Sequence, residues 1–277
     1  MTLYRPHDLN DALGFLAEGS ALVLAGATDV LPALGDRPAP ERILDITALS
    51  ELLGIKEGPE GWRIGAAVTW AELCAAALPP QFDALKEAGR QVGSVQIQTK
   101  ATIAGNICNA SPAADGTPVL MALGASVEMV SAQGRRVLPL TQFVTGARRT
   151  ALGPSAIVTA IIVPRIGGDV RSAFAKLGSR AYLVISIASL AAVLRFDGPV
   201  VAEARIAVGA CSPVPVRLPT LERELVGQRV GALSQVLRAE HFTDLAPIDD
   251  VRATSSYRRD ACHTLAGRML DRCGAGR

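Results

Sequence analysis

Residues 96–115 read QIQTKATIAGNICNASPAAD, and this stretch decides the expected fold. It is dense in small and amide-bearing residues and poor in charge. Loops in compact domains usually span about 4–6 residues, so a solvated loop of this length and uniform composition is unusual. At its end, Asp115 is placed to cap a helix through residues 118–123. We therefore interpret the stretch as a long loop whose main chain approaches a ligand.

A second stretch of small residues, 25–29 with the sequence AGATD, follows a short apolar strand. Backbone N–H groups can hold the oxygens of a pyrophosphate where the main chain comes close, and a close approach requires small side chains. The hydroxyls of Thr28 and Thr102 can add donors, whereas Asp29 and Asp115 suit the hydroxyls of ribose or ribityl groups. The two stretches together predict a dinucleotide site.

Each stretch also has a simpler interpretation. The pattern A-G-x-T-D after a strand is often only a tight turn. In the longer stretch, Asn106 can satisfy its own backbone in a buried turn. The sequence contains no G-x-G-x-x-G, which argues against a Rossmann site.

The 277-residue length predicts about two domains, and 49% hydrophobic residues suffice for a sizeable core. The glycine-rich segment 166–169 is the expected boundary. We expect an α+β fold with a small βαβ lobe over residues 1–55, a mixed-sheet lobe over 56–168 and a C-terminal α+β domain over 169–277. The expected helices cover 8–19, 30–35, 70–77, 81–89, 118–123, 219–226, 231–239 and 255–272, and the expected strands 21–25, 42–46, 53–57, 62–67, 127–130, 136–138, 157–163, 173–177, 185–194 and 204–208.

Composition excludes several classes of function. A net charge of +2 with 4% aromatic residues offers neither a basic stripe nor stacking rings for nucleic acid. The 5 cysteines form no C-x-x-C pair, which argues against a disulfide scaffold, a zinc site or an iron–sulfur cluster and favours the cytoplasm. The longest apolar run, 183–194, is shorter than the roughly 18 residues of a membrane span. The histidines are isolated, and we expect neither a metal site nor a catalytic set.

The motifs resemble those of a known family, the FAD subunits of molybdenum hydroxylases such as xanthine dehydrogenase and aerobic carbon monoxide dehydrogenase. Residues 25–30 are similar to the family pattern A-G-G-T-D-L, and residues 102–107 to T-I-G-G-N-I. The resemblance continues through SPAAD at 111–115 and into the C-terminal half. Ala27 and Ala104 depart from it, since the family usually has glycine there. If either position requires a positive φ, alanine costs about 1 kcal/mol.

The resemblance implies the two-lobed FAD-binding fold of the vanillyl-alcohol-oxidase or PCMH type, followed by a C-terminal flavoprotein domain. It places Ile97, Val158 and Lys176 near the isoalloxazine, and it gives Asp115 a hydrogen bond to the cofactor. The full set of residues that it implies for FAD is Leu24, Ala25, Gly26, Ala27, Thr28, Asp29, Val30, Ile97, Ala101, Thr102, Ala104, Gly105, Asn106, Cys108, Asn109, Asp115, Val158 and Lys176.

The resemblance also implies partners, because the chain has no iron–sulfur cysteines of its own. An iron–sulfur subunit would pass electrons from a molybdenum-cofactor subunit to the FAD, and an external acceptor such as NAD or a quinone would receive them. Two alternatives stay open. One is a self-contained FAD-dependent oxidoreductase acting on a small molecule. The other is an assembly subunit that has lost its cofactor, which only Ala27 and Ala104 favour.

Overall fold

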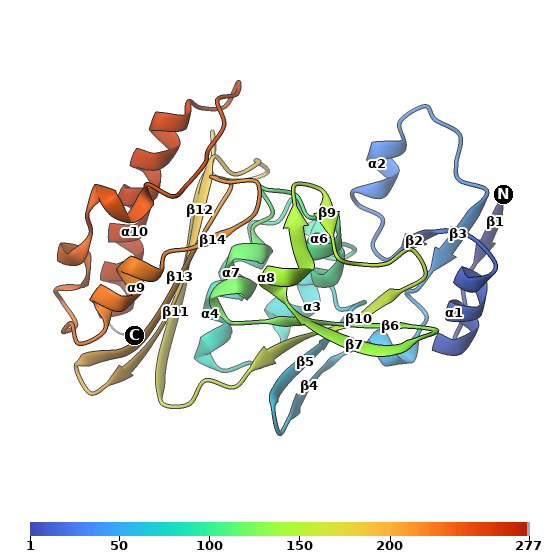
Figure 1. The fold of residues 1–277 in the computed structure, drawn as a ribbon, viewed down its shortest axis with the longest axis horizontal. Coiled ribbons are helices and arrows are strands. Elements are labelled where there is room, and N and C mark those ends of the chain that lie inside the picture. The colour runs from blue at the N-terminus through green and yellow to red at the C-terminus, as the bar shows by residue number, and fades with distance from the viewer. Residues whose placement is uncertain (276–277) are drawn as a thin grey trace.

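The computed structural model describes residues 1–275, which form three lobes in a row (Figure 1). The N-terminal lobe is a parallel sheet in the order β1-β3-β2 with two helices. Its first helix begins where the sequence predicts, because the Asp8 carboxylate accepts from the amides of Asn10 and Asp11. The elements are β1 (Thr2–Tyr4), α1 (Leu9–Ala17), β2 (Leu22–Leu24), α2 (Val30–Leu34) and β3 (Arg42–Asp45).

The middle lobe is built on a five-stranded antiparallel sheet in the order β4-β5-β10-β6-β7. The predicted capping box is present, since Thr69 and Glu72 exchange hydrogen bonds at the start of α3. The elements are η1 (Ser50–Leu52), β4 (Ile55–Gly58), β5 (Gly61–Gly65), α3 (Trp70–Ala75), η2 (Pro80–Phe82), α4 (Asp83–Gly89), α5 (Val95–Gln98), α6 (Ile103–Asn109), α7 (Gly116–Ala122), β6 (Ser126–Ser131), β7 (Gly134–Pro139), α8 (Leu140–Phe143), β8 (Val144–Gly146), β9 (Arg149–Thr150) and β10 (Ile157–Pro164).

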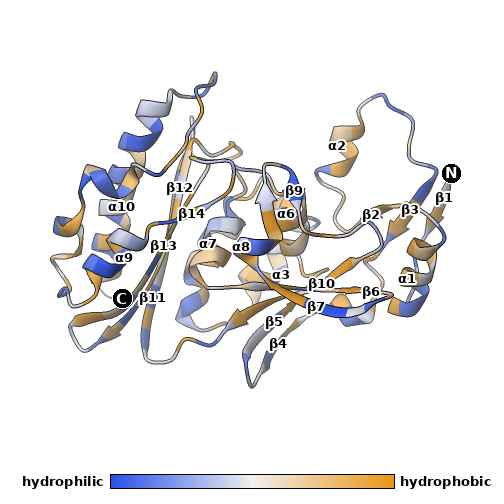
Figure 2. Ribbon diagram, viewed as in Figure 1, coloured by the Kyte–Doolittle hydropathy of each residue, from blue (hydrophilic) through white to orange (hydrophobic). Residues whose placement is uncertain are grey.

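The C-terminal lobe is an antiparallel sheet in the order β11-β12-β13-β14, covered on one face by α9 and α10. Its elements are β11 (Asp169–Leu177), β12 (Ala188–Asp197), β13 (Val200–Gly209), β14 (Val216–Arg217), α9 (Pro219–Leu225), η3 (Leu233–Val236), η4 (Ala239–Phe242) and α10 (Ser255–Ala275). Along β12, Ala191 and Val193 pack into the core of the middle lobe, whereas Leu190 and Leu194 pack toward the helices. Both faces of β12 are therefore buried, which explains its nearly continuous apolar sequence (Figure 2).

Three expectations about helices and strands were wrong. The stretch 96–115, interpreted as one long loop, contains the end of α5 and the whole of α6. Thr102 caps α6, and Ile103 and Ile107, one turn apart, are both buried. In place of the helix expected over 231–239, the chain forms one short 3₁₀ turn, η3, followed by the extended Leu237 and Arg238. A second 3₁₀ turn, η4, begins only at Ala239. The turn η3 packs against α10 and α9.

The third error concerns the strand expected from residue 185, since β12 begins only at Ala188. The hydroxyl of Ser186 turns instead to the carboxylate of Asp115, at 2.5 Å. Asp115 does precede a helix, as predicted, but its side chain makes no capping bond to α7. Ser186 and Asp115 thus bond to each other, in place of the strand expected at Ser186 and the helix cap expected at Asp115.

Candidate flavin site

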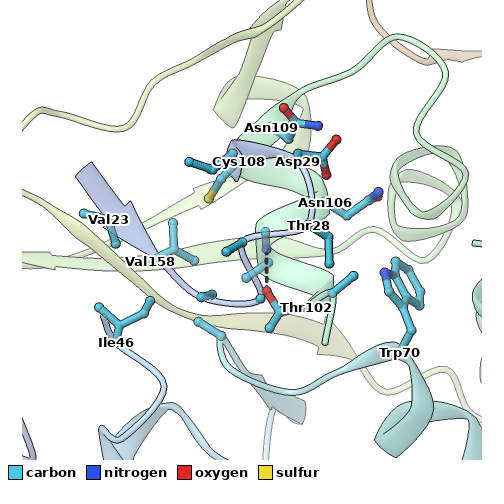
Figure 3. Close-up of a pocket in the computed structure, with 18 of the residues that line it drawn as sticks. Val23, Thr28, Asp29, Ile46, Trp70, Thr102, Asn106, Cys108, Asn109 and Val158 are labelled. Atoms are coloured by element: carbon cyan, nitrogen blue, oxygen red, sulfur yellow. Dashed lines mark hydrogen bonds between the residues drawn. The ribbon is translucent and has the colours of Figure 1, made fainter. Parts of the chain in front are cut away.

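One cavity of about 380 Å³ lies where the first lobe meets the middle lobe (Figure 3). Both small-residue stretches line it, although they are far apart in the sequence. The predicted residues that the structure brings together here are Ala25, Gly26, Ala27, Thr28, Asp29, Val30, Ile97, Ala101, Thr102, Ala104, Gly105, Asn106, Cys108, Asn109 and Val158. Leu24, Asp115 and Lys176 lie outside its lining.

Gly26 is the point at which the two stretches touch. A Cβ built on Gly26 would lie 1.9 Å from the carbonyl oxygen of Lys100 and 2.9 Å from the Cα of Ala101. Both are main-chain atoms, which cannot rotate away as the end of a side chain can. Glycine is therefore required at this position for the two stretches to meet, in addition to any requirement of a ligand.

The turn after β2 leaves its main-chain donors free. Within residues 1–275, the amides of Gly26, Ala27 and Thr28 donate to no protein acceptor. Ala27 has a φ of 57°, in the left-handed region that alanine adopts at a cost of roughly 1–2 kcal/mol. A left-handed residue within a run of free amides is typical of the backbone concavities that bind anions.

The second stretch contributes the first turn of α6. The Thr102 hydroxyl accepts from the amide of Gly105 at 3.0 Å, and the Asn106 amide donates to the Thr102 carbonyl. The Gly105 and Asn106 amides are therefore used inside the helix, contrary to the expectation that this stretch offers bare amides. Ala104 lies inside this helix, where alanine carries no penalty, so of the two alanines that replace the family's glycines it is Ala27 that is strained.

Trp70 lines the same cavity, although no motif in the sequence indicates it as a site residue. Its amide donates to the carbonyl of Ala101, and the amide of Ile103 donates to the carbonyl of Val68. These two bonds tie the start of α3 to the second stretch. The capping box predicted the helix but not which element its first residue would contact. The other lining residues without a sequence signal are the apolar Val23, Ile46, Ala66, Val92, Leu152, Ala156 and Ile157.

Two buried polar atoms of the cavity wall have no partner within the described chain. They are Nε1 of Trp70 and Oδ1 of Asn106. Buried polar groups in proteins are nearly always hydrogen-bonded, so such atoms call for a missing partner. A dinucleotide, whose phosphate oxygens suit the free amides of Gly26, Ala27 and Thr28, fits the residues that are present.

Asp115 and Lys176 form a buried ion pair with each other. Lys176 Nζ lies 2.5 Å from Asp115 Oδ2, and both side chains are only 6% exposed. Burial raises the pKa of the Asp115 carboxyl, against the opposing effects of Lys176 and of the hydrogen bond from Ser186. The pair joins the start of α7 to β11, and the roles that the sequence analysis gave these residues toward a cofactor stay predictions.

The thiol of Cys108 in the cavity wall is not ionised. Burial raises the pKa of the Cys108 thiol to about 12, so this thiol is protonated at neutral pH. Among residues 1–275, no cluster of three or more histidine, cysteine or acidic side chains could hold a metal ion. Over the same residues, no helix is both long enough and apolar enough to cross a membrane.

Comparison with known proteins gives matches over almost the whole chain. Residues 1–166 match the family described as the FAD binding domain in molybdopterin dehydrogenase, and residues 173–273 match the CO dehydrogenase flavoprotein C-terminal domain. The chain is 32% identical over 275 residues to the xanthine dehydrogenase FAD-binding subunit of Escherichia coli O157:H7, covering 96% of this chain and 94% of that protein.

Two further comparisons agree. The carbon monoxide dehydrogenase medium chain of Afipia carboxidovorans is 29% identical, with 98% of this chain and 96% of the relative covered. A crystal structure of the Cu,Mo-CO dehydrogenase contains a chain that superposes with a TM-score of 0.92 at 27% identity, covering 99% of this chain and 98% of that one.

Proposed function

The chain belongs to the family of FAD-binding subunits of xanthine and carbon monoxide dehydrogenase-type molybdenum hydroxylases, and from this premise we propose that it is an electron-transfer subunit. As a member it is an oxidoreductase subunit whose cofactor is FAD. We propose that it takes electrons from an iron–sulfur subunit, supplied by a molybdenum-cofactor subunit, and delivers them to an external acceptor such as NAD or a quinone.

One observation supports the proposal above all others: the small-residue stretches 25–30 and 101–109 line a single cavity. When bound there, FAD supplies a centre that takes up electrons singly and releases them in pairs. The chain's own contribution is to bind and enclose. The free amides of Gly26, Ala27 and Thr28 suit phosphate oxygens, and the apolar Ile97 and Val158 suit a flat ring system.

Two further parts of the proposal concern organisation and location. We place the boundary between the FAD-binding domain and the C-terminal domain within the glycine-rich segment 166–169, immediately before β11. We also place the protein in the cytoplasm, because Cys74, Cys108, Cys211, Cys262 and Cys273 are all free thiols.

Reconstitution with FAD tests the proposal. The purified chain, incubated with excess FAD and desalted, should retain a flavin absorption band, and denaturation should release FAD rather than FMN. Retention of no flavin contradicts the proposal and favours an assembly subunit without a cofactor. Turnover of a small substrate by the isolated holoprotein, without partners, would instead support the self-contained oxidoreductase.

A further inference from the structure

Two of the five cysteines are in contact inside the C-terminal lobe. Cys211 lies just after β13 and Cys262 lies in α10, and their Sγ atoms are 3.3 Å apart although the residues are 51 positions apart in the sequence. Both side chains are fully buried in the core between the sheet and its helices. Among residues 1–275, Cys74, Cys108 and Cys273 form no hydrogen bond with another cysteine. Cys211 and Cys262 are therefore the two thiols placed to react with each other.

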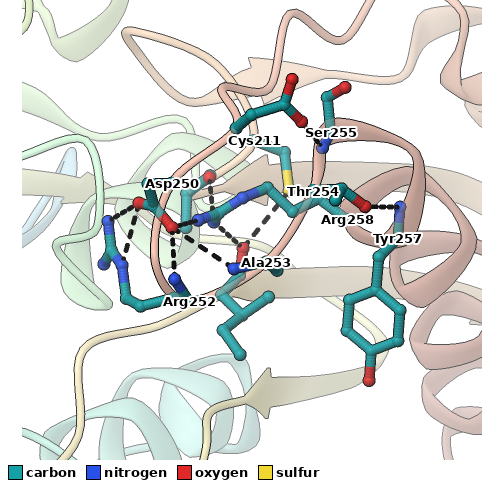
Figure 4. Close-up of polar contacts among 11 residues, drawn as sticks. Cys211, Asp250, Arg252, Ala253, Thr254, Ser255, Tyr257 and Arg258 are labelled. Carbon is teal, nitrogen blue, oxygen red and sulfur yellow. Dashed lines mark hydrogen bonds and ion pairs between the residues drawn. The ribbon is translucent and has the colours of Figure 1, made fainter.

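The surroundings of the pair make Cys211 the more acidic of the two thiols. The hydrogen bond from the Cys262 thiol lowers the pKa of Cys211, against the effect of burial, and the charge of Arg258 lowers it as well. The same hydrogen bond, together with burial, raises the pKa of Cys262. Arg258 is held beside the pair by its hydrogen bonds to the carbonyls of Ile187 and Ala210 (Figure 4). Because the thiolate is the nucleophilic form of cysteine, Cys211 is the nucleophile of the pair.

The segment next to the pair is irregular. Residues 243–249 contain no helix or strand, and most of them are exposed. Leu245 packs into the same core as the two thiols. The amide of Ala246 donates to the hydroxyl of Ser212, the residue after Cys211. Exposed irregular segments open locally at a lower free energy than strands and helices, so we expect a small oxidant to reach the thiols through such openings.

We propose that Cys211 and Cys262 are a site of oxidative modification, at which hydrogen peroxide converts the two thiols to a disulfide that joins the end of β13 to α10. The Cys211 thiolate attacks the peroxide and breaks its O–O bond, which gives a sulfenic acid and, after protonation, one water. The sulfur of Cys262 loses its proton and displaces hydroxide from that sulfenic acid, which leaves as a second water. In sum, two S–H bonds are replaced by one S–S bond, and the peroxide takes up two electrons and two protons.

The modification is reversible, and it is compatible with free thiols in the resting protein. A reducing compartment keeps such a pair as two thiols until an oxidant appears, and thiol exchange restores them afterwards. A disulfide has an S–S distance of about 2.0 Å, so the sulfurs must approach each other by about 1.3 Å, the difference from 3.3 Å. The equilibrium between thiols and disulfide measures whether the fold accommodates this approach.

Peptide mapping tests the modification directly. The full chain is treated with hydrogen peroxide, the remaining thiols are alkylated under denaturing conditions, and the peptides are identified by mass spectrometry. We expect a cross-linked pair of peptides that contain Cys211 and Cys262. Cys273 is a matched control, because it is buried in the same helix without a thiol partner, and it should stay alkylated. Cys262→Ser should abolish the cross-link, whereas Cys273→Ser should leave it.

A second measurement does not depend on how fast peroxide enters the core. The wild-type chain is equilibrated with mixtures of oxidised and reduced dithiothreitol, once folded and once unfolded in urea. The folded sample is approached from both sides, starting from reduced protein and from protein that was oxidised in urea and then refolded. A disulfide that fits the native structure should be favoured about 30- to 1000-fold more in the folded chain than in the unfolded chain.

Three results would overturn the proposal. One is an equilibrium constant for the folded chain that is equal to or below that for the unfolded chain. Another is a cross-link that pairs either cysteine with a different thiol. The third is oxidation of Cys211 to a sulfinic acid with Cys262 still alkylated. None of these measurements requires bound FAD, so their outcome is independent of the proposed function.

Discussion

The contact at Gly26 leads to the sharpest prediction, the effect of Gly26→Ala. The new methyl group would begin 1.9 Å from the Lys100 carbonyl oxygen. Ordinary van der Waals contact begins at 3.4 Å, so the two main-chain stretches must move apart by 1.5 Å, the difference between 3.4 and 1.9 Å. Overpacking of this kind typically costs about 1–3 kcal/mol.

Because both stretches line the cavity, the displacement should reach the cofactor as well as the fold. Moving the two stretches apart relieves the strain but widens the cavity. If this costs about 1.4–2.8 kcal/mol of the free energy of FAD binding, the affinity for FAD falls roughly 10- to 100-fold. Flavin fluorescence titration measures the affinity, and urea denaturation of the apoprotein measures the free energy of unfolding. Both quantities should fall together.

Two other glycines serve as graded controls. Gly14, in α1, has no atom within 4 Å of its built Cβ, so Gly14→Ala should leave FAD affinity unchanged and stabilise the fold by about 0.5–1 kcal/mol. At Gly105 the Cβ meets only the Thr102 hydroxyl, at 2.8 Å, and displacing this cap should cost about 1 kcal/mol. A Gly26→Ala protein with the affinity and stability of Gly14→Ala would refute the reasoning.

Three further predictions follow from single residues. Ala27→Gly removes the strain of an alanine in the left-handed conformation but adds the larger entropy that glycine loses on folding. The net result should be a rise of about 0.5–1 kcal/mol in the free energy of unfolding, measured in urea. The hydrogen bond from Arg252 lowers the pKa of Asp250, so this carboxylate stabilises the fold above about pH 4 and stabilises it less as pH falls. Asp250→Asn should therefore reduce the loss of the free energy of unfolding on acidification, measured by urea denaturation at a series of pH values. Lys176→Met removes the ion-pair partner of the buried Asp115 and should cost about 3–5 kcal/mol in urea denaturation, with Asp115→Asn restoring most of it.

The acid-limb prediction concerns a cluster at the start of α10 (Figure 4). The Asp250 carboxylate accepts hydrogen bonds from the guanidinium groups of Arg252, at 2.5 Å, and of the buried Arg258, at 2.8 Å. Arg258 also donates to the carbonyl of Ile187. In the native state these bonds favour the ionised carboxylate, so the unfolded chain takes up its proton first on acidification. Arg252→Ala should therefore flatten the acid limb in the same direction as Asp250→Asn.

The parts of the site that the sequence predicts are those with a local cause. The small residues Gly26, Ala104 and Gly105 indicate a close main-chain approach, and the structure places them around one cavity. The sequence explains only in part why glycine is needed at position 26, because the atoms that a Cβ there would meet belong to the main chain of Lys100. The residues next to Gly26 in the sequence do not indicate that Lys100 lies beside it.

The helix α6 could have been found and was not. Thr102 is a favourable N-cap residue, and Ile103 and Ile107 have the spacing of one helical face. The density of glycine, alanine and asparagine concealed this signal, since these residues are also typical of loops. By contrast, the break at Leu237 has no comparable local cause, because contacts of η3 with α10 and α9 decide the conformation there.

Lys176 lies outside the cavity lining, and it can influence a bound flavin either through its ion pair with Asp115 or through its own charge. Its partner Asp115 lies 61 residues earlier and joins α7 to β11, so loss of the lysine charge disturbs the contact between the middle and C-terminal lobes. The stability and the reduction potential of the bound flavin therefore need to be measured in the same Lys176→Met protein. A shifted potential that Asp115→Asn reverses, together with stability, would indicate that the pair positions the surrounding structure. A shift that persists in the restored double variant would indicate that the lysine charge acts on the flavin directly.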